Sequence, residues 1–173
     1  MPKDLREGYY IQIQGNFFQI IAKEPFSYIT SSVTAEFSAV ATGSESGYQN
    51  IEKLEPAEGR LYQCFFGVAD GLAYHFKLPS GSDRWGVDED KDIGYIDSII
   101  SPYFAPNPDF EVFLVENIYP SVNAKNATGV TVTPKIYVSG FKYDLRKATK
   151  KEQEELVDAK KPFTILTIGG VSQ

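Results

Sequence analysis

The sequence predicts an all-β fold: an eight-stranded jelly-roll barrel or sandwich with one short helix near the C-terminal end. Three observations predict it. Phenylalanine and tyrosine are abundant, with 12 and 11 copies among 173 residues, and aromatic residues favour strands. Eight separate segments have strand character, and several of them alternate apolar and polar residues with the period of a strand. A length of 173 residues suits one domain, which we assign to residues 1–173.

The eight predicted strands follow one another with turns or polar loops between them. They are Tyr9–Gln14, Phe17–Ala22, Tyr28–Val40, Leu61–Val68, Leu72–Leu78, Phe110–Tyr119, Val130–Tyr143 and Phe163–Ile168. Gly15 and Asn16 predict a tight turn after the first strand, and Pro25 separates the second from the third. At about 3.3 Å per residue the third strand could span roughly 40 Å, a length typical of barrels and sandwiches.

The fourth and fifth strands are predicted to pair as a hairpin, because Asp70 and Gly71 between them are a strong turn signal. The length of that turn decides which side chains enter the core. A three-residue turn ending in a left-handed glycine puts four side chains on the core face, and a two-residue turn points them outward: Tyr62, Cys64, Phe66 and Val68. The three-residue turn gives the cleaner amphipathic sheet and is preferred.

Three segments are predicted as loops or insertions: Ala41–Arg60, Pro79–Pro108 and Pro120–Gly129. Within the second, Ile93–Ile100 is expected to form a short helical turn, and the prolines that follow it forbid regular structure. The strand Phe110–Tyr119 is apolar on both faces and is predicted to be buried on both. Pro134 breaks the next strand or places it at a sheet edge.

One helix is predicted from a capping box. Thr149 is the N-cap and Glu152 is the third helical residue, so each side chain can bond the backbone N–H of the other. The helix is expected to run to about Lys160 and to stop before Pro162, and the last strand follows it.

Composition and charge exclude several classes of function. The formal net charge is −6 and the pI about 4.9, which argues against direct binding of nucleic acid or of an anionic lipid surface. Cys64 is the single cysteine, so no intramolecular disulfide can form. The N-terminal residues are too polar for a secretory signal, and no apolar run approaches the ~20 residues that span a bilayer. We therefore expect synthesis and folding in the cytosol.

Few residues are suited to catalysis or metal binding. His75 is the only histidine, and in the preferred register it lies on the opposite sheet face from Cys64, so we expect a solvated histidine and a core cysteine. The acidic run Asp88–Asp92 resembles the start of a calcium loop. An EF-hand needs glycine at position six and glutamate at twelve, where this chain has Ile93 and Ile99. Two interpretations of Asp88–Asp92 therefore stay open, a solvated run of charges in a loop or a looser cation site.

Two further patterns give only weak indications of a modification site or a catalytic site. Asn126–Thr128 matches the glycosylation acceptor pattern and is interpreted as a loop without sugar. Glu36, Glu111 and Glu116 are the carboxylates that a glycosidase-like site could use if two of them faced each other. The sequence places no such pair, so we expect no enzyme, no catalytic residue, no metal and no cofactor.

Aromatic residues occur on both faces of several predicted strands: Tyr9, Tyr10, Phe17, Phe18, Phe65, Phe66, Phe113 and Tyr119. One interpretation is a closed two-sheet core. The other is a set of subunit contacts on top of that core, because interfaces favour tyrosine and phenylalanine.

Three segments carry a resemblance to a family: Phe110–Pro120, Val132–Gly140 and Lys161–Gly170. They resemble strands of the small single-jelly-roll major capsid protein of tailless icosahedral double-stranded DNA bacteriophages with an internal membrane, which infect thermophilic bacteria. The resemblance implies a viral structural protein whose barrel stands upright on the shell. It implies dimers, a second capsid protein as partner, and a place in the virion after assembly in the host cytoplasm. No site residue is carried over, and no small-molecule substrate is expected.

Two rival classes stay open. A carbohydrate-binding sandwich would present an exposed aromatic platform, for which Trp85 and Tyr95 are the candidates. A glycosidase-like jelly roll would need the facing carboxylates described above. For the capsid reading, the strand Phe163–Ile168 is isolated behind the helix, so its exchange between subunits is conceivable. The acidic pI gives no support for membrane contact.

Overall fold

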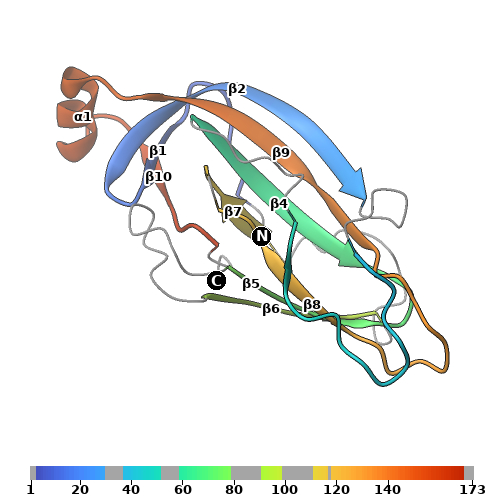
Figure 1. The fold of residues 1–173 in the computed structure, drawn as a ribbon. Helices are drawn as coiled ribbons and strands as arrows, with labels where there is room; N and C mark the ends of the chain where they lie inside the picture. The colour runs from blue at the N-terminus through green and yellow to red at the C-terminus, as the bar shows by residue number, and fades with distance from the viewer. Residues whose placement is uncertain are drawn as a thin grey trace.

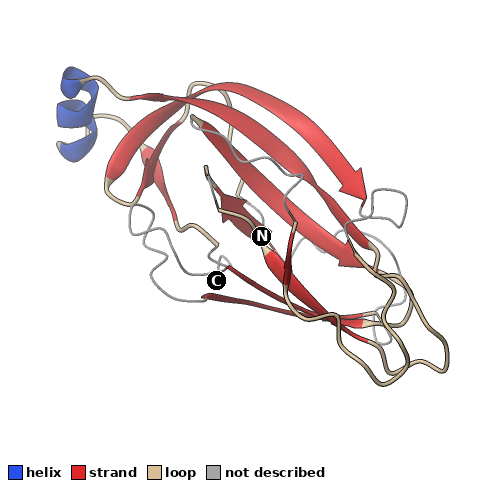
Figure 2. Cartoon of the chain, viewed as in Figure 1, coloured by secondary structure: helices blue, strands red, loops and turns tan. Residues whose placement is uncertain are grey.

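The computed structural model describes residues 3–29, 37–51, 59–78, 91–98, 111–116 and 118–169. These residues form ten strands and one helix, arranged as two sheets that face each other, with the helix at one end (Figures 1 and 2). The mostly-β fold and the single short helix are therefore confirmed, while the number of strands exceeds the predicted eight.

The larger sheet has six strands in the order β10-β1-β2-β9-β4-β7, and the smaller has four in the order β3-β8-β5-β6. The strands of the larger sheet are β1 (Tyr10–Ile13), β2 (Asn16–Ile29), β4 (Arg60–Val68), β7 (Glu111–Leu114), β9 (Ile136–Lys147) and β10 (Phe163–Leu166). Those of the smaller sheet are β3 (Gln49–Asn50), β5 (Ala73–Leu78), β6 (Lys91–Asp97) and β8 (Ser121–Lys125).

Strands β2 to β9 pair in a nested pattern. β2 pairs with β9, β3 with β8, β4 with β7, and β5 with β6, and every one of these pairs is antiparallel. Successive pairs alternate between the larger and the smaller sheet. β1 and β10 extend the larger sheet beyond this nested set, and β10 runs parallel to β1.

The long strand of the N-terminal region is β2, which includes Pro25, so the prediction of a break at Pro25 is wrong. Pro25 is opposite Phe141 of β9. In the described residues β1 covers the other edge of β2 only as far as Gln19, so a missing N–H beyond that point costs no ladder bond. The predicted strand Tyr28–Val40 is described only at its ends: β2 ends at Ile29, and Val40 makes an isolated bridge.

The turn between β1 and β2 consists of Gln14 and Gly15, one residue earlier than predicted. Both have positive φ, 49° and 78°, and Ile13 is opposite Asn16. Two positive φ values give the twist that joins hairpin strands.

The predicted hairpin between β4 and β5 is wrong, although its turn is present. Asp70 and Gly71 both have positive φ, but β4 pairs with β9 and β7 while β5 pairs with β6 and β8. The turn carries the chain from one sheet to the other. The preferred core face is nevertheless buried, because the two strands face each other: the Phe66 and Phe76 ring centroids lie 4.9 Å apart.

Three strands occupy segments that were predicted as loops. β6 includes most of the expected helical turn Ile93–Ile100, β8 lies within Pro120–Gly129, and β3 lies within Ala41–Arg60. Each of these strands is short or polar on one face, so its sequence gives only a weak strand signal. Each forms because it pairs with a neighbour, β5 or β8. Pro134 precedes β9, which begins at Ile136.

The core lies between the sheets and fills with aromatic and branched side chains. The largest fully buried ones include Tyr74, Phe66, Phe76, Ile11 and Ile13. On the outer face of the larger sheet, the segment after residue 3 packs over β4, β7 and β9. Leu5 is 1% exposed there, and Gln63 Nε2 donates to the Lys3 carbonyl at 2.8 Å.

The helix α1 (Lys150–Val157) begins as predicted. Thr149 accepts from the Glu152 N–H, and the Glu152 carboxylate accepts from the Thr149 N–H, which completes the capping box. The helix ends at Val157 rather than near Lys160, because the chain turns at Ala159 with φ of 57°.

Candidate functional site

The open edge of the larger sheet is the candidate functional site. In the described part of the chain, β10 pairs with β1 alone. Phe163 is 36% exposed and Ile165 63%, and both share the outer face with their partners on β1, Tyr10 and Gln12. An edge strand with exposed apolar side chains is a template for pairing with another chain.

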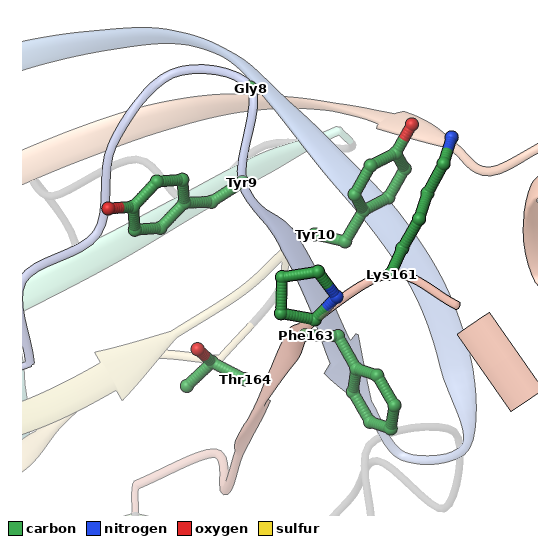
Figure 3. Close-up of a pocket in the computed structure, with 7 residues that line it drawn as sticks. Gly8, Tyr9, Tyr10, Lys161, Phe163 and Thr164 are labelled. Atoms are coloured by element: carbon green, nitrogen blue, oxygen red, sulfur yellow. The ribbon is translucent and has the colours of Figure 1, made fainter. Parts of the chain in front are cut away.

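A cavity of about 510 Å³ opens beside this edge. Its lining comes from the chain at the starts of β1 and β10: Gly8, Tyr9, Tyr10, Lys161, Pro162, Phe163 and Thr164. Figure 3 shows Tyr10 and Lys161 side by side, with Tyr9 pointing away from them. The Lys161 ammonium lies 5.3 Å from the centre of the Tyr10 ring. Three of the seven lining residues are aromatic, which suits an apolar side chain of a partner protein.

An ionic network fixes α1 against this end of the sheet. The Glu152 carboxylate accepts two bonds of 2.8 Å from Arg146 of β9 and a further bond from the Tyr10 hydroxyl of β1. The Arg146 guanidinium is the main cause that holds the pKa of Glu152 well below its usual range, followed by Tyr10 and the Thr149 N–H. Glu152 and Arg146 are thus both charged at neutral pH, and their bonds position the strands that line the cavity.

A second cluster lies on the outer face of the smaller sheet, around the only histidine. His75 Nδ1 lies 2.5 Å from the Tyr48 hydroxyl, and Nε2 lies 2.7 Å from Asp92 Oδ1. Because a carboxylate only accepts, Nε2 carries a proton in this pairing. The Tyr95 ring stacks on the imidazole, with centroids 4.2 Å apart and planes 6° from parallel.

The charged neighbours of this cluster have partners on the same surface. Lys77 Nζ lies 3.9 Å from the centre of the Tyr48 ring. Lys125 makes an ion pair of 3.3 Å with Glu45, which also accepts from Asn123 at 3.2 Å. Asn123 is the β8 residue directly opposite His75. The ring cluster around His75 and the Lys125–Glu45 pair therefore lie on one continuous surface.

The structure separates Cys64 from His75, as expected. Cys64 is fully buried in the larger sheet, and burial raises the pKa of its thiol. His75 is on the outer face of the other sheet. A buried thiol of this kind is protonated at neutral pH and is not a nucleophile.

The carboxylate candidates are not brought together as a reaction site. Glu36 lies outside the described residues. Glu111 is 2% exposed beneath the N-terminal segment, where its Oε2 accepts from the Lys3 N–H and from Gln63. Glu116 follows the end of β7. A substrate could not reach Glu111 in this arrangement.

Two other predicted sites have partial outcomes. Within Asp88–Asp92, residues 88–90 lie outside the described residues, as does Trp85; Asp92 belongs to β6 and binds His75. Within the described ranges, no three His, Cys, Asp or Glu side chains form a group that could hold a metal. Asn126, the asparagine of the glycosylation pattern, is buried. Its side-chain amide donates 2.8 Å bonds to the carbonyls of Val40 and Val130, so both amide hydrogens are used within the loop.

The two-faced aromatic residues divide between core and surface. Phe18, Phe66 and Phe113 are buried, whereas Tyr9 is 44% exposed. Sequence reasoning missed Ile165 and Tyr48 as surface candidates. For Ile165 a signal existed, because the last predicted strand has apolar residues on both faces. For Tyr48 there was none, since only the β3–β8 pairing brings it to His75.

Comparison of the chain with protein-family models, with curated proteins and with solved structures found no match. In the described part of the chain, no helix is long and apolar enough to cross a membrane.

Proposed function

We propose that this chain is a structural subunit that associates through its β10 edge into a larger assembly, and that this assembly is a viral capsid. The observation that carries the proposal is the edge strand β10 with its exposed apolar side chains, beside a cavity lined in part by Tyr9, Tyr10 and Phe163. A monomeric protein normally blunts or covers such an edge, since an open one invites pairing with another chain.

The strand order supports a jelly-roll fold for the subunit. A jelly roll is an eight-stranded double sheet built from two Greek keys, and it is the fold of many capsid and lectin domains. The nested antiparallel pairs of β2 to β9, alternating between the sheets, match that wrapping. Since a fold alone does not give a function, the assembly proposal rests on the edge and not on the topology.

The proposed interface is an isologous pairing of β10 with β10 of a second copy. A two-fold axis would place the same Phe163 and Ile165 surface on both partners, and each side chain would leave water. The cavity lined by Tyr9 and Tyr10 would receive an apolar side chain from the partner. A second capsid protein, as the family resemblance implies, could use the same edge in the shell.

Sedimentation of the purified chain over a range of concentrations tests this proposal. We expect dimers or larger species, and at least about tenfold weaker association for Ile165→Asp, because a charge would be buried at the interface. Val130→Asp is the matched control, since Val130 is 65% exposed but lies away from β10. A strict monomer at high concentration, or equal loss in the control, would contradict the proposal.

A further inference from the structure

The outer face of the smaller sheet carries an arrangement that assembly through β10 does not use. Two exposed tyrosines flank His75: Tyr95 from β6, 65% exposed, and Tyr48 from the chain before β3, 42% exposed. In the sheet order, β5 with His75 lies between β6 and β3. The three rings therefore form a row across the sheet.

Contacts between neighbouring rings and hydrogen bonds to the imidazole hold the row in place. His75 packs flat against one face of Tyr95, and the large exposed fraction of Tyr95 leaves the opposite face to solvent. Hydrogen bonds to Tyr48 and Asp92 hold both nitrogens of His75, which fixes the plane of the ring. A fixed aromatic surface loses little conformational entropy when a ligand covers it.

The charges around the row indicate which ligand it suits. Lys77 lies over Tyr48, Lys125 is paired with Glu45, and Asp92 is paired with His75. Two lysines and two carboxylates, Lys77, Lys125, Glu45 and Asp92, balance one another, so these groups offer little net charge to an ionic ligand. It offers ring faces and polar groups such as the Asp92 side chain, which is 69% exposed.

We propose that this row, Tyr48, His75 and Tyr95 with Asp92 beside it, is a binding site for a neutral carbohydrate chain. A pyranose ring has an apolar face of C–H groups that gains by leaving water against the free face of Tyr95. Its hydroxyl groups can donate to the Asp92 carboxylate, which fixes orientation. The free face of Tyr95 would accommodate one pyranose unit of the chain, and the exposed Asp92 beside it would provide polar contacts to that unit.

The same chemistry argues against nucleic acid as the occupant. Bases also stack on tyrosine, but the phosphates of a bound strand require free lysines or arginines nearby. Lys77 and Lys125 already have partners on this surface.

The test is titration of the full chain by NMR or calorimetry with cellohexaose, maltohexaose and chitohexaose at up to about 5 mM. We expect one or more of them to bind, with affinity at least about tenfold weaker in Tyr95→Ala and largely retained in Tyr95→Phe. Ile21→Ala removes an apolar side chain of β2 that is 53% exposed and lies outside both proposed sites, and it is the control. Circular dichroism of each variant verifies folding.

Three outcomes would overturn the site. They are no binding of any of the three hexasaccharides, equal affinity in Tyr95→Ala, and binding of a thymidine dodecamer in place of the sugars. None of these depends on whether the chain self-associates through β10, so the two proposals stand or fall separately.

Discussion

The two edge strands of the larger sheet have opposite environments. All four residues of β7 are buried, and a network of buried polar groups lies beside it on β4 and β9. In β10 only Leu166 is buried, and Phe163 and Ile165 are exposed. The N-terminal segment covers the β7 side, whereas a partly buried ionic network holds α1 at the β10 side.

The β7 side therefore contributes to the stability of the fold, whereas the β10 side presents side chains that are available for contact with a partner. At the β7 side Gln63 Oε1 accepts from the Tyr143 hydroxyl at 2.7 Å, and Gln63 Nε2 donates to Glu111 at 2.8 Å, so removal of one partner leaves a buried polar atom unpaired. At the β10 side Ile165 contributes little to the stability of the isolated chain, because its side chain is 63% exposed to water. Changes on the two sides should therefore affect different properties.

The largest effect is expected from Gly140→Ala, at the position where β9 pairs with Cys64 of β4. Gly140 has φ of +149°, and a Cβ there would lie 1.8 Å from the Gln63 carbonyl oxygen. Because that atom belongs to the backbone, the strands would have to separate, and we expect a loss of at least about 3–4 kcal/mol of unfolding free energy or failure to fold. Thermal melting and soluble yield measure it.

Gly129→Ala is the control for that substitution, since a Cβ at Gly129 meets nothing within 4 Å. It should change the unfolding free energy by less than about 0.5 kcal/mol. Wild-type melting of Gly140→Ala would mean that β4 and β9 do not pair in this register.

A matched pair of truncations compares the two sides directly. Leu5→Ala removes a side chain that is 1% exposed in the N-terminal segment, and should cost about 2–5 kcal/mol. Ile165→Ala, 63% exposed on β10, should cost less than about 0.5 kcal/mol in the dissociated chain. Urea unfolding at low protein concentration measures both. Similar losses would contradict the contrast between a covered and an open side.

The smallest effect is expected from Glu152→Gln, which weakens the ionic network at the β10 side. The pKa of Glu152 is lowered in the folded chain by Arg146, Tyr10 and the Thr149 N–H, relative to an ordinary value of 4.5. Its ionised form thus stabilises the fold fully above about pH 4.5, and this stabilisation is lost as the pH falls towards the folded pKa.

The difference in melting temperature between wild type and Glu152→Gln should therefore be full at pH 7 and should shrink as the pH is lowered below 5. Glu154→Gln, an exposed residue of the same helix, is the control and should show no such trend. A difference that stays constant from pH 7 to pH 2 would show that the ion pair is not what stabilises this end.

Local patterns were sufficient for the elements that carry their own signal. The capping box of Thr149 and Glu152 starts the helix as predicted, and the alternation around Tyr74 and Phe76 gave β5. Pairing was harder, because Asp70 and Gly71 make the same turn whether the next strand joins the same sheet or the opposite one. The burial of Cys64 is compatible with both arrangements.

The candidate sites show the same division. Tyr95 was identified from its sequence neighbourhood, while Tyr48 comes from a segment more than twenty residues before His75 and had no local signal. The last predicted strand has apolar residues on both faces, and only the tertiary structure shows that the face with Ile165 is the outer one.

The sequence by itself determined the mostly-β class, the helix start, the buried cysteine and the apolar content of both strand faces, since these depend on residue type and spacing. The tertiary structure alone decided which strands share a sheet and, among the described residues, that β10 is an edge strand, because strand pairing depends on residues far apart in the chain. Thus Phe163 and Ile165 became a candidate interface, and Tyr48, His75 and Tyr95 became one surface, through long-range pairing.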